Sequence, residues 1–314
     1  MISQVIQQFA QNPLKFRIID TLYESERSLV QSIKLRGCTD TTDTLVLKLF
    51  KEKEKHQIET EIEILTHLNK EDQKHVIKLL TCYQVETSFI FLYKEYFSSL
   101  FEDLPSIGLC YEETLDMSKQ IFSILSYLKK HKIIHNDIKP HNFLLDADNT
   151  LTLTDFEFSC HEEKISDINP RKGTPMYMSP ERLLYKHLVD GYSSDLWSAA
   201  ATIYTIATCS YAFQGTLYTD IQKLHQIRLG TSYPKEFPSD ALLIEQDCLD
   251  KQPKENLLIN RLKISLQSKK DFSKETLIQL DQFTSLLLKI FVFDPPSRIS
   301  IEEALELIPS YEKS

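Results

Sequence analysis

The stretch IIHNDIKPHNFLLD at residues 133–146, followed by LTLTDFEFS at 151–159, concentrates chemically active side chains. Asp137, Lys139 and Asn142 share one short segment, and Asp155 follows on the next. An aspartate can orient a hydroxyl and accept its proton, and a lysine can neutralise moving negative charge. Amide and carboxylate oxygens suit Mg²⁺. This set at this spacing favours a phosphoryl-transfer site over a group of solvated surface charges.

Composition places the chain among ordinary globular proteins. It has 314 residues, 42% hydrophobic and 26% charged, which suits one large domain or two tightly joined lobes. The net charge of −9 argues against a broad basic surface for nucleic acid or anionic membrane. No apolar run reaches the roughly 18 residues of a membrane helix, and the first residues lack the features of a signal peptide. Six widely spaced cysteines predict reduced thiols in a cytoplasmic or nuclear protein.

The first third of the chain has the pattern of a small sheet. Short apolar or alternating runs predict strands, and one segment with a helical period interrupts them. The strands are expected at 16–22, 28–35, 44–50, 75–80 and 88–97, and the helix at 56–69. We therefore expect a small antiparallel sheet lobe with one helix at 14–96, after an N-terminal extension at 1–13 in which residues 2–10 could form a helix.

Helical patterns dominate from residue 111 onward. The segment SSDLWSAAATIYTIATCS at 193–210 is apolar on nearly every side, so it predicts a buried central helix with Ser193 or Ser194 as its cap. A polar stretch at 231–276 shows no clear period and predicts an insertion. The expected fold class is α+β, with the larger helical lobe at 97–314.

The segment HNDIKPHN resembles the catalytic loop H-R-D-x-K-x-x-N of eukaryotic-type protein kinases, and DFE stands where D-F-G would be. The resemblance implies a bilobal protein-kinase-like fold. It also implies a protein that binds ATP and Mg²⁺, with Asp137 and Lys139 as catalytic residues and Asn142 and Asp155 as metal ligands. A lysine two residues after the aspartate is similar to serine/threonine rather than tyrosine kinases. In GTPMYMSPE at 173–181, Thr174 resembles the threonine that contacts the catalytic aspartate and lysine.

Other motifs extend the resemblance beyond the catalytic loop. Glu181 of GTPMYMSPE is expected to pair with Arg298 in a structural role. Asp195 of SSDLWS resembles the aspartate of the central helix that anchors the catalytic-loop backbone.

The nucleotide-binding side of the resemblance rests on LVLKLF at 45–50, which is similar to the V-A-I-K strand. Lys48 would bind the α- and β-phosphates and pair with Glu61, with Glu63 as the alternative partner. Counting along the later strand puts Tyr93 at the gatekeeper position and Lys94, Glu95 and Tyr96 in the hinge, although a slip of one residue would exchange the faces. The residues expected to sandwich the base are Val30, Val46 and Leu144.

Three departures from the family pattern have expected consequences. Tyr23, Ser25 and Ser28 replace the glycines that let backbone N–H groups approach phosphate, so we expect weaker ATP binding. Glu157 replaces the D-F-G glycine that usually lets this segment flip, so we expect Asp155 to be locked in one state. Asn136 replaces the catalytic-loop arginine, so we expect activity that does not require phosphorylation between residues 156 and 173.

The leading hypothesis is a serine/threonine protein kinase that transfers the ATP γ-phosphate to protein hydroxyls. A pseudokinase scaffold that regulates a partner is the alternative. The missing glycines and Glu157 support it, and the presence of Lys48, Asp137, Asn142 and Asp155 opposes it. A small-molecule phosphotransferase also fits HNDIKPHNF alone. The expected partners are an unidentified protein substrate and a possible regulatory protein.

Overall fold

The chain forms two compact units, each built from two segments. The first unit comprises Met1–Phe97 and Leu145–Glu157, and the second comprises Ser98–Leu144 and Phe158–Ser314. The computed structural model describes residues 16–24, 28–35, 44–50, 55–71, 73–85, 88–94, 98–167, 172–183, 190–212, 257–269, 272–292 and 294–309. The predicted helix at 2–10 lies outside these residues.

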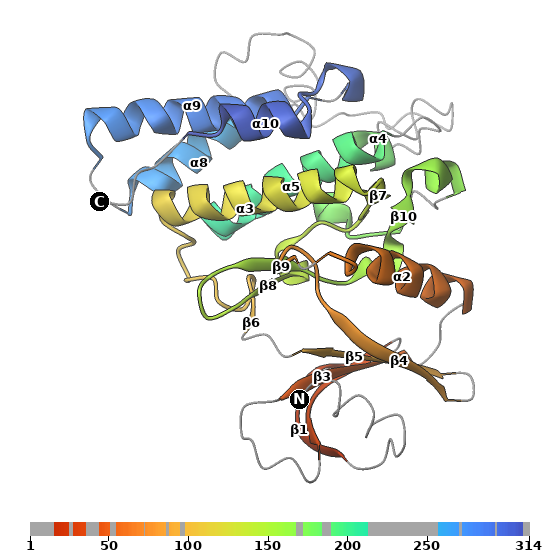
Figure 1. Cartoon of the computed structure of the whole chain (residues 1–314). Helices are drawn as coiled ribbons and strands as arrows, with labels where there is room; N and C mark the ends of the chain where they lie inside the picture. Colours follow the sequence, from red (N-terminus) through yellow and green to blue (C-terminus); the bar gives the residue numbers. More distant parts are fainter. Residues whose placement is uncertain are drawn as a thin grey trace, which may run out of the picture. The chain divides into compact units, whose positions relative to one another are not determined.

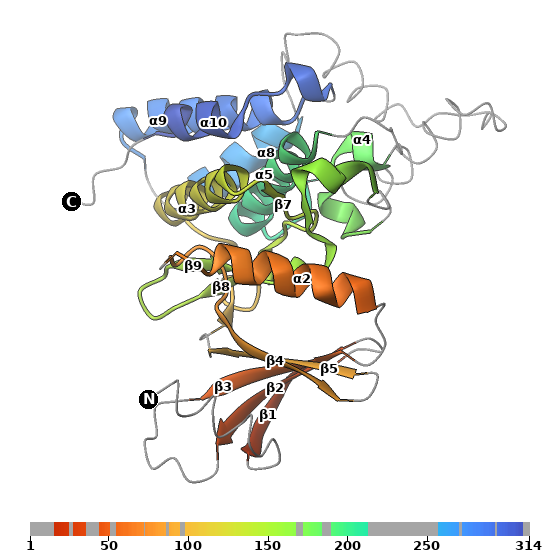
Figure 2. The ribbon, with the colours of Figure 1, turned by 45° about the vertical axis from the view of Figure 1, so that its right-hand side comes forward.

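Within the described part of the first unit, five strands form one antiparallel sheet in the order β1-β2-β3-β5-β4 (Figures 1 and 2). They are β1 (Phe16–Glu24), β2 (Ser28–Leu35), β3 (Leu45–Phe50), β4 (Leu79–Val85) and β5 (Ser88–Lys94). Each strand coincides with or overlaps a predicted strand, because alternating apolar side chains give the pleated ribbon a buried face.

The two faces of the sheet carry different residues. Ile33, Leu45, Leu47 and Leu92 form a buried apolar cluster on one face. The intervening residues of β3, including Lys48, point to the opposite face, because successive side chains of a strand alternate. The rings of Phe50 and Phe91 meet edge to face there, with centroids 4.8 Å apart. The face that carries Lys48 is therefore aromatic in part.

One predicted strand is misplaced. The sequence predicted a strand at 75–80, but β4 begins at Leu79 and continues to Val85. The residues before it bind elsewhere: the Asn69 side chain donates to the carbonyl of Ile77 and accepts from the N–H of Leu79. Because Asn69 holds this segment, the sheet pairing starts only after it.

Leu145–Glu157 groups with the first unit through backbone bonds. The N–H of Ile77 donates to the carbonyl of Leu153, and the N–H of Leu153 donates to the carbonyl of His75, both at 2.9 Å. Leu153 lies in β9 (Leu151–Leu153). The expected lobe at 97–314 included residues 145–157, which belong to the first unit. The expected boundaries at 13/14 and 96/97 stay predictions.

The helix of the first unit is α2 (Lys55–Leu68), which lies alongside the sheet (Figure 2). Its buried apolar residues are Ile58, Ile64, Leu65 and Leu68. Their spacing follows the helical period that predicted this element. Glu61 is buried on α2 while Glu63 is exposed, which distinguishes the two candidate partners of Lys48.

The second unit is mainly helical (Figure 1). Its longer helices are α3 (Tyr111–Lys130), α5 (Gly191–Thr208), α8 (Leu257–Gln267), α9 (Lys274–Ile290) and α10 (Ile301–Leu307). Its shorter elements are α4 (Pro180–Leu183), β6 (Ser98–Ser99), β7 (Ile133–Ile134) and β10 (Cys160–His161), and β8 (Phe143–Leu145) ends where the chain enters the first unit. The described residues contain no helix that is both long enough and apolar enough to cross a membrane.

Two expectations for this unit need correction. The central helix α5 is buried along almost its whole length, as predicted, but it begins at Gly191. Its cap is Asp190, whose carboxylate accepts from the N–H groups of Tyr192 and Ser193, so neither Ser193 nor Ser194 is the cap. The stretch predicted at 231–276 as aperiodic contains α8, which buries three apolar residues. Residues 231–256 lie outside the described part of the chain.

Glu181, at the end of the segment 173–181, forms a buried ion pair with Arg298, as the sequence predicted. Arg298 donates to both carboxylate oxygens of Glu181, at 2.9 and 3.1 Å, and both side chains are fully buried. Arg298 also donates to the carbonyls of Val292 and Ser193, and its guanidinium lies over the ring of Trp197. Every charged atom therefore has a partner, which a buried ion pair requires.

We predict that Arg298→Met destabilises the protein by about 3–5 kcal/mol, because it leaves the Glu181 carboxylate buried without its cation. The matched control is Lys263→Met, which removes the exposed ion pair between Lys263 and Asp281 and should cost less than about 1 kcal/mol. Urea unfolding monitored by circular dichroism measures both. Equal stability of the two variants would contradict the assigned role of the buried pair.

Candidate active site

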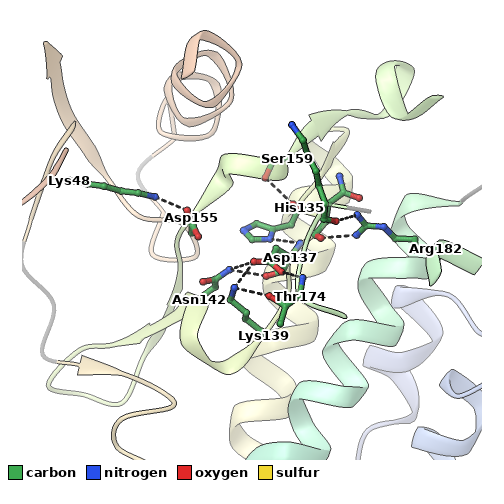
Figure 3. Close-up of polar contacts among 11 residues, drawn as sticks. Lys48, His135, Asp137, Lys139, Asn142, Asp155, Ser159, Thr174 and Arg182 are labelled. Carbon is green, nitrogen blue, oxygen red and sulfur yellow. Dashed lines mark hydrogen bonds and ion pairs between the residues drawn. The ribbon is translucent and has the colours of Figure 1, made fainter. Parts of the chain in front are cut away.

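Lys48 and Asp155 form a close ion pair within the first unit. The ammonium of Lys48, on β3, lies 2.6 Å from a carboxylate oxygen of Asp155, just after β9 (Figure 3). Burial alone would lower the pKa of Lys48, but the charges of Asp155 and Glu61 outweigh it and leave the pKa raised. Lys48 therefore stays protonated at neutral pH and presents a fixed positive charge.

The residues expected around the nucleotide lie on the Lys48 face of the sheet. In the strand pairing Val30 lies opposite Lys48, and Val46 lies opposite Tyr93. Directly opposed residues share a face, and Val46 is two residues from Lys48, so all four side chains point the same way. Burial raises the pKa of the Tyr93 hydroxyl, which the charges of Glu61 and Asp155 raise further.

Some of the expected nucleotide contacts cannot be located in the same way. Glu95 and Tyr96 of the hinge, and Ser25 in the loop between β1 and β2, lie outside the described residues. Leu144 lies in β8, on the second-unit side of the division, and is partly buried. The binding roles assigned to these residues stay predictions.

The second unit brings together the three residues predicted to be catalytic. The ammonium of Lys139 lies 2.7 Å from one carboxylate oxygen of Asp137 and 2.9 Å from the Thr174 hydroxyl (Figure 3). The other carboxylate oxygen of Asp137 accepts the N–H of Thr174 at 2.7 Å. The sequence predicted these contacts, and they hold the Asp137 carboxylate in one orientation.

Asn142 also contacts Asp137. It is buried, and its amide nitrogen donates to the Asp137 carbonyl at 2.9 Å and to the Asp137 carboxylate at 3.3 Å. An amide with its nitrogen fixed in this way has a carbonyl oxygen of defined direction, which suits a hard cation. In the described part of the chain no three His, Cys, Asp or Glu side chains cluster as a metal site. Mg²⁺ commonly takes only one or two protein ligands alongside waters and substrate phosphates, so Asn142 in the second unit and Asp155 in the first are each of a type that it accepts.

Asp195 holds the backbone that carries Asp137. Its carboxylate, on α5, accepts the N–H of His135 at 2.7 Å and the N–H of Asn136 at 2.9 Å. Burial raises the pKa of Asp195 to about 6, while the two backbone N–H groups and the charge of Arg182 oppose that rise. Asn136 adopts a left-handed backbone with φ +69°, a conformation that this anchor helps to maintain.

Two contributions were not predicted from the sequence. Glu157 raises the pKa of Lys48, so a third carboxylate acts on that lysine in the place where the family motif has glycine. Arg182 is buried and donates to the carbonyls of Asn136 and Lys172. The only sequence signal for Arg182 was a charged residue directly after Glu181, and such residues are usually solvated.

Comparison with known proteins agrees with this geometry. The family model described as the protein kinase domain matches residues 34–307. A dual specificity mitogen-activated protein kinase kinase, mek-1, of Caenorhabditis elegans is 34% identical over 140 residues, which cover 44% of this chain and 40% of the relative.

Two further relatives carry names of serine/threonine-protein kinases. TIO of Arabidopsis thaliana is 30% identical over 211 residues, 66% of this chain and 15% of the relative. Ppk34 of Schizosaccharomyces pombe is 30% identical over 146 residues, 46% of this chain and 41% of the relative. The matched part therefore spans less than half the length of each of these relatives.

The sheet unit, the helical unit and the matched motifs agree with the expected α+β class. With a family match over residues 34–307, the chain belongs to the protein kinase family.

Proposed function

We propose that this chain is a serine/threonine kinase that transfers the γ-phosphate of Mg·ATP to hydroxyl groups of a protein substrate. The observation that carries the proposal is the arrangement around Asp137. Lys139 and the Thr174 N–H each bind one oxygen of the carboxylate. A carboxylate held in this way can orient a substrate hydroxyl and accept its proton, while Lys139 lies close enough to stabilise the transferred phosphoryl group.

Lys48 supplies the fixed charge on the nucleotide side. Its raised pKa keeps it protonated, and its ion pair with Asp155 orients the ammonium. Asp155 and Asn142 would hold Mg²⁺, which when bound neutralises charge that develops on the phosphates.

Two features support hydroxyls of serine and threonine as acceptors. Lys139 follows Asp137 by two residues and bonds Thr174, the arrangement that the serine/threonine resemblance implies. The names of two of the relatives point the same way, whereas mek-1 is named a dual specificity kinase. Location in the cytoplasm or nucleus, and a regulatory partner, stay part of the proposal.

A non-catalytic scaffold is the second candidate, favoured by one observation. Tyr23, Ser25 and Ser28 occupy the positions of three glycines that would let backbone N–H groups reach the phosphates. Against it, a scaffold has no use for a lysine, two aspartates and an asparagine with the pairings described above. An assay of phosphate transfer separates the two candidates.

We predict that Asp137→Asn lowers kcat by about 10²- to 10⁴-fold, because the amide cannot accept the proton of the attacking hydroxyl. The measurement is transfer from γ-labelled ATP to a generic protein substrate, followed by phosphoamino acid analysis. The matched control is Asp148→Asn, an exposed aspartate in the turn after β8, which should retain wild-type activity. Wild-type protein that binds Mg·ATP without transferring phosphate would favour the scaffold.

We predict that restoring glycine at residues 23, 25 and 28 tightens Mg·ATP binding by about tenfold, or about 1.4 kcal/mol. The three glycines would let the loop backbone approach the phosphates and would remove two hydroxyls and a phenol from its path. Isothermal titration calorimetry measures the Kd. Thr21→Gly, in exposed strand β1, serves as the control for added flexibility. An unchanged Kd in the triple variant would remove the loop from the explanation.

We predict that phosphatase treatment leaves the kinase activity within about twofold of the untreated protein. Asn136 has no positive charge to pair with a phosphate, and its side chain instead donates to the carbonyl of Phe158 at 3.0 Å. Mass spectrometry of residues 156–173 confirms that Ser159 and Ser166 carry no phosphate in the treated sample. Loss of all activity on treatment is the result that contradicts this prediction.

A further inference from the structure

Arg182 occupies an unusual environment for an arginine. It lies on α4 and is only 3% exposed. Its guanidinium donates through Nη1 to the Asn136 carbonyl at 2.7 Å and through Nη2 to the Lys172 carbonyl at 2.5 Å (Figure 3). Burial lowers the pKa of Arg182, and the nearby charges of Asp195, Asp137 and Glu181 favour its cation. Burial of a guanidinium is costly, so its bonds to these two carbonyls must matter to the fold.

The two carbonyls belong to the two chain segments that hold Asp137. Asn136 directly precedes Asp137 in the catalytic loop. Lys172 is followed by Gly173 and then by Thr174, whose N–H donates to the Asp137 carboxylate. One side chain therefore ties the backbone that carries Asp137 to the backbone that fixes the direction of its carboxylate.

The positive φ of Asn136 needs support from its neighbours, whereas a glycine such as Gly173 adopts a positive φ freely. Asn136 has φ +69° and Gly173 has φ +115°. The two come so close that a Cβ on residue 173 would lie 2.8 Å from the Asn136 carbonyl oxygen. A left-handed residue other than glycine costs about 1 kcal/mol or more, so the arrangement persists only where neighbours fix it. Asp195 fixes the N–H side of Asn136, and Arg182 fixes its carbonyl side.

We infer that Arg182 is a positioning residue for phosphoryl transfer, which clamps the carbonyls of Asn136 and Lys172 so that Asp137 and Thr174 keep their reacting arrangement. This inference rests on the proposed function. The clamp consists of a permanent cation inside the second unit, so it needs no modification of the segment between residues 156 and 173. It gives a physical basis for activity without phosphorylation that the substitution at Asn136 alone does not provide.

A tether of the same kind elsewhere in the unit provides the control. Lys269 donates to the carbonyls of Leu109 and Ala207, at 2.9 and 2.5 Å, and so joins the end of α5 to the segment before α3. Like Arg182 it is a cation that bonds two backbone carbonyls, but its partners belong to neither segment around Asp137. Lys269→Met therefore reports the cost of losing such a tether without affecting the reacting groups.

The test compares Arg182→Met, Arg182→Lys and Lys269→Met with wild type. Turnover is expressed per molecule that binds Mg·ATP, counted by calorimetric titration, so that a loss of folded protein does not count as a loss of rate. We expect Arg182→Met to lower kcat by about 10- to 100-fold, with KM for Mg·ATP within twofold, because the reacting groups lose alignment while the nucleotide contacts remain. Arg182→Lys, which keeps the charge and one bond, should recover part of the rate.

An activity-independent readout accompanies the kinetics. Hydrogen exchange of the Thr174 amide, which donates to Asp137, should be faster in Arg182→Met than in wild type and unchanged in Lys269→Met. Equal kcat per binding site, or equal exchange at Thr174, in Arg182→Met and wild type would overturn the inference. If Arg182→Met does not fold, Arg182→Lys decides in the same way.

The two proposals can fail separately. A wild-type protein that transfers no phosphate refutes the proposed function, and with it the positioning role of Arg182 in phosphoryl transfer. Faster Thr174 exchange in Arg182→Met would then still establish the clamp as a structural device. An active wild type with an unaffected Arg182→Met refutes the inference alone.

Discussion

The carboxylate of Asp195 is the constraint on which the helical unit's site depends. It is buried on the central helix α5 and accepts two consecutive backbone N–H groups, those of His135 and Asn136. A charge in that position is costly, and its raised pKa of about 6 shows that the cost is only partly offset. The loop that carries Asp137 is thereby attached at two points to the buried central helix α5. The left-handed turn at Asn136 then directs Asp137 toward its partners.

The sheet unit follows a different principle, the concentration of negative charge around one lysine. Asp155, Glu61 and Glu157 all raise the pKa of Lys48, and the first of these is in direct contact with it. Because the ammonium is outnumbered by carboxylates, it holds its proton at any physiological pH. Bound phosphates would compete with these carboxylates for the Lys48 ammonium. Glu157 would therefore affect nucleotide affinity in addition to the altered loop.

The segment that carries Asp137 could be predicted from the sequence because its polar residues lie close together in the chain. Asp137, Lys139 and Asn142 share one short loop, so their spacing alone indicates that they converge. The helical period likewise separated Glu61, which is buried, from Glu63, which is exposed. Such local patterns predicted most of the sheet, α2, α3 and α5.

Other features of the fold and the site were not predicted from the sequence. Asp190 and Ser193 are both good helix caps by residue type, and the structure alone shows which one begins α5. The period of α8 was hidden because the segment around it is polar and charged. The burial of Arg182 was not predicted, because its partners are the carbonyls of Asn136 and Lys172, which no local pattern connects to it.

The central proposal is that this chain binds Mg·ATP, with Lys48, Asp155 and Asn142 among the residues that take part. Hydrogen exchange with a non-hydrolysable ATP analogue tests it most directly, measured with and without Mg²⁺. We expect the analogue with Mg²⁺ to slow exchange in peptides that cover Lys48 and in peptides that cover residues 133–146, and the second effect to require the metal. Slower exchange in the Lys48 peptides alone would contradict the account.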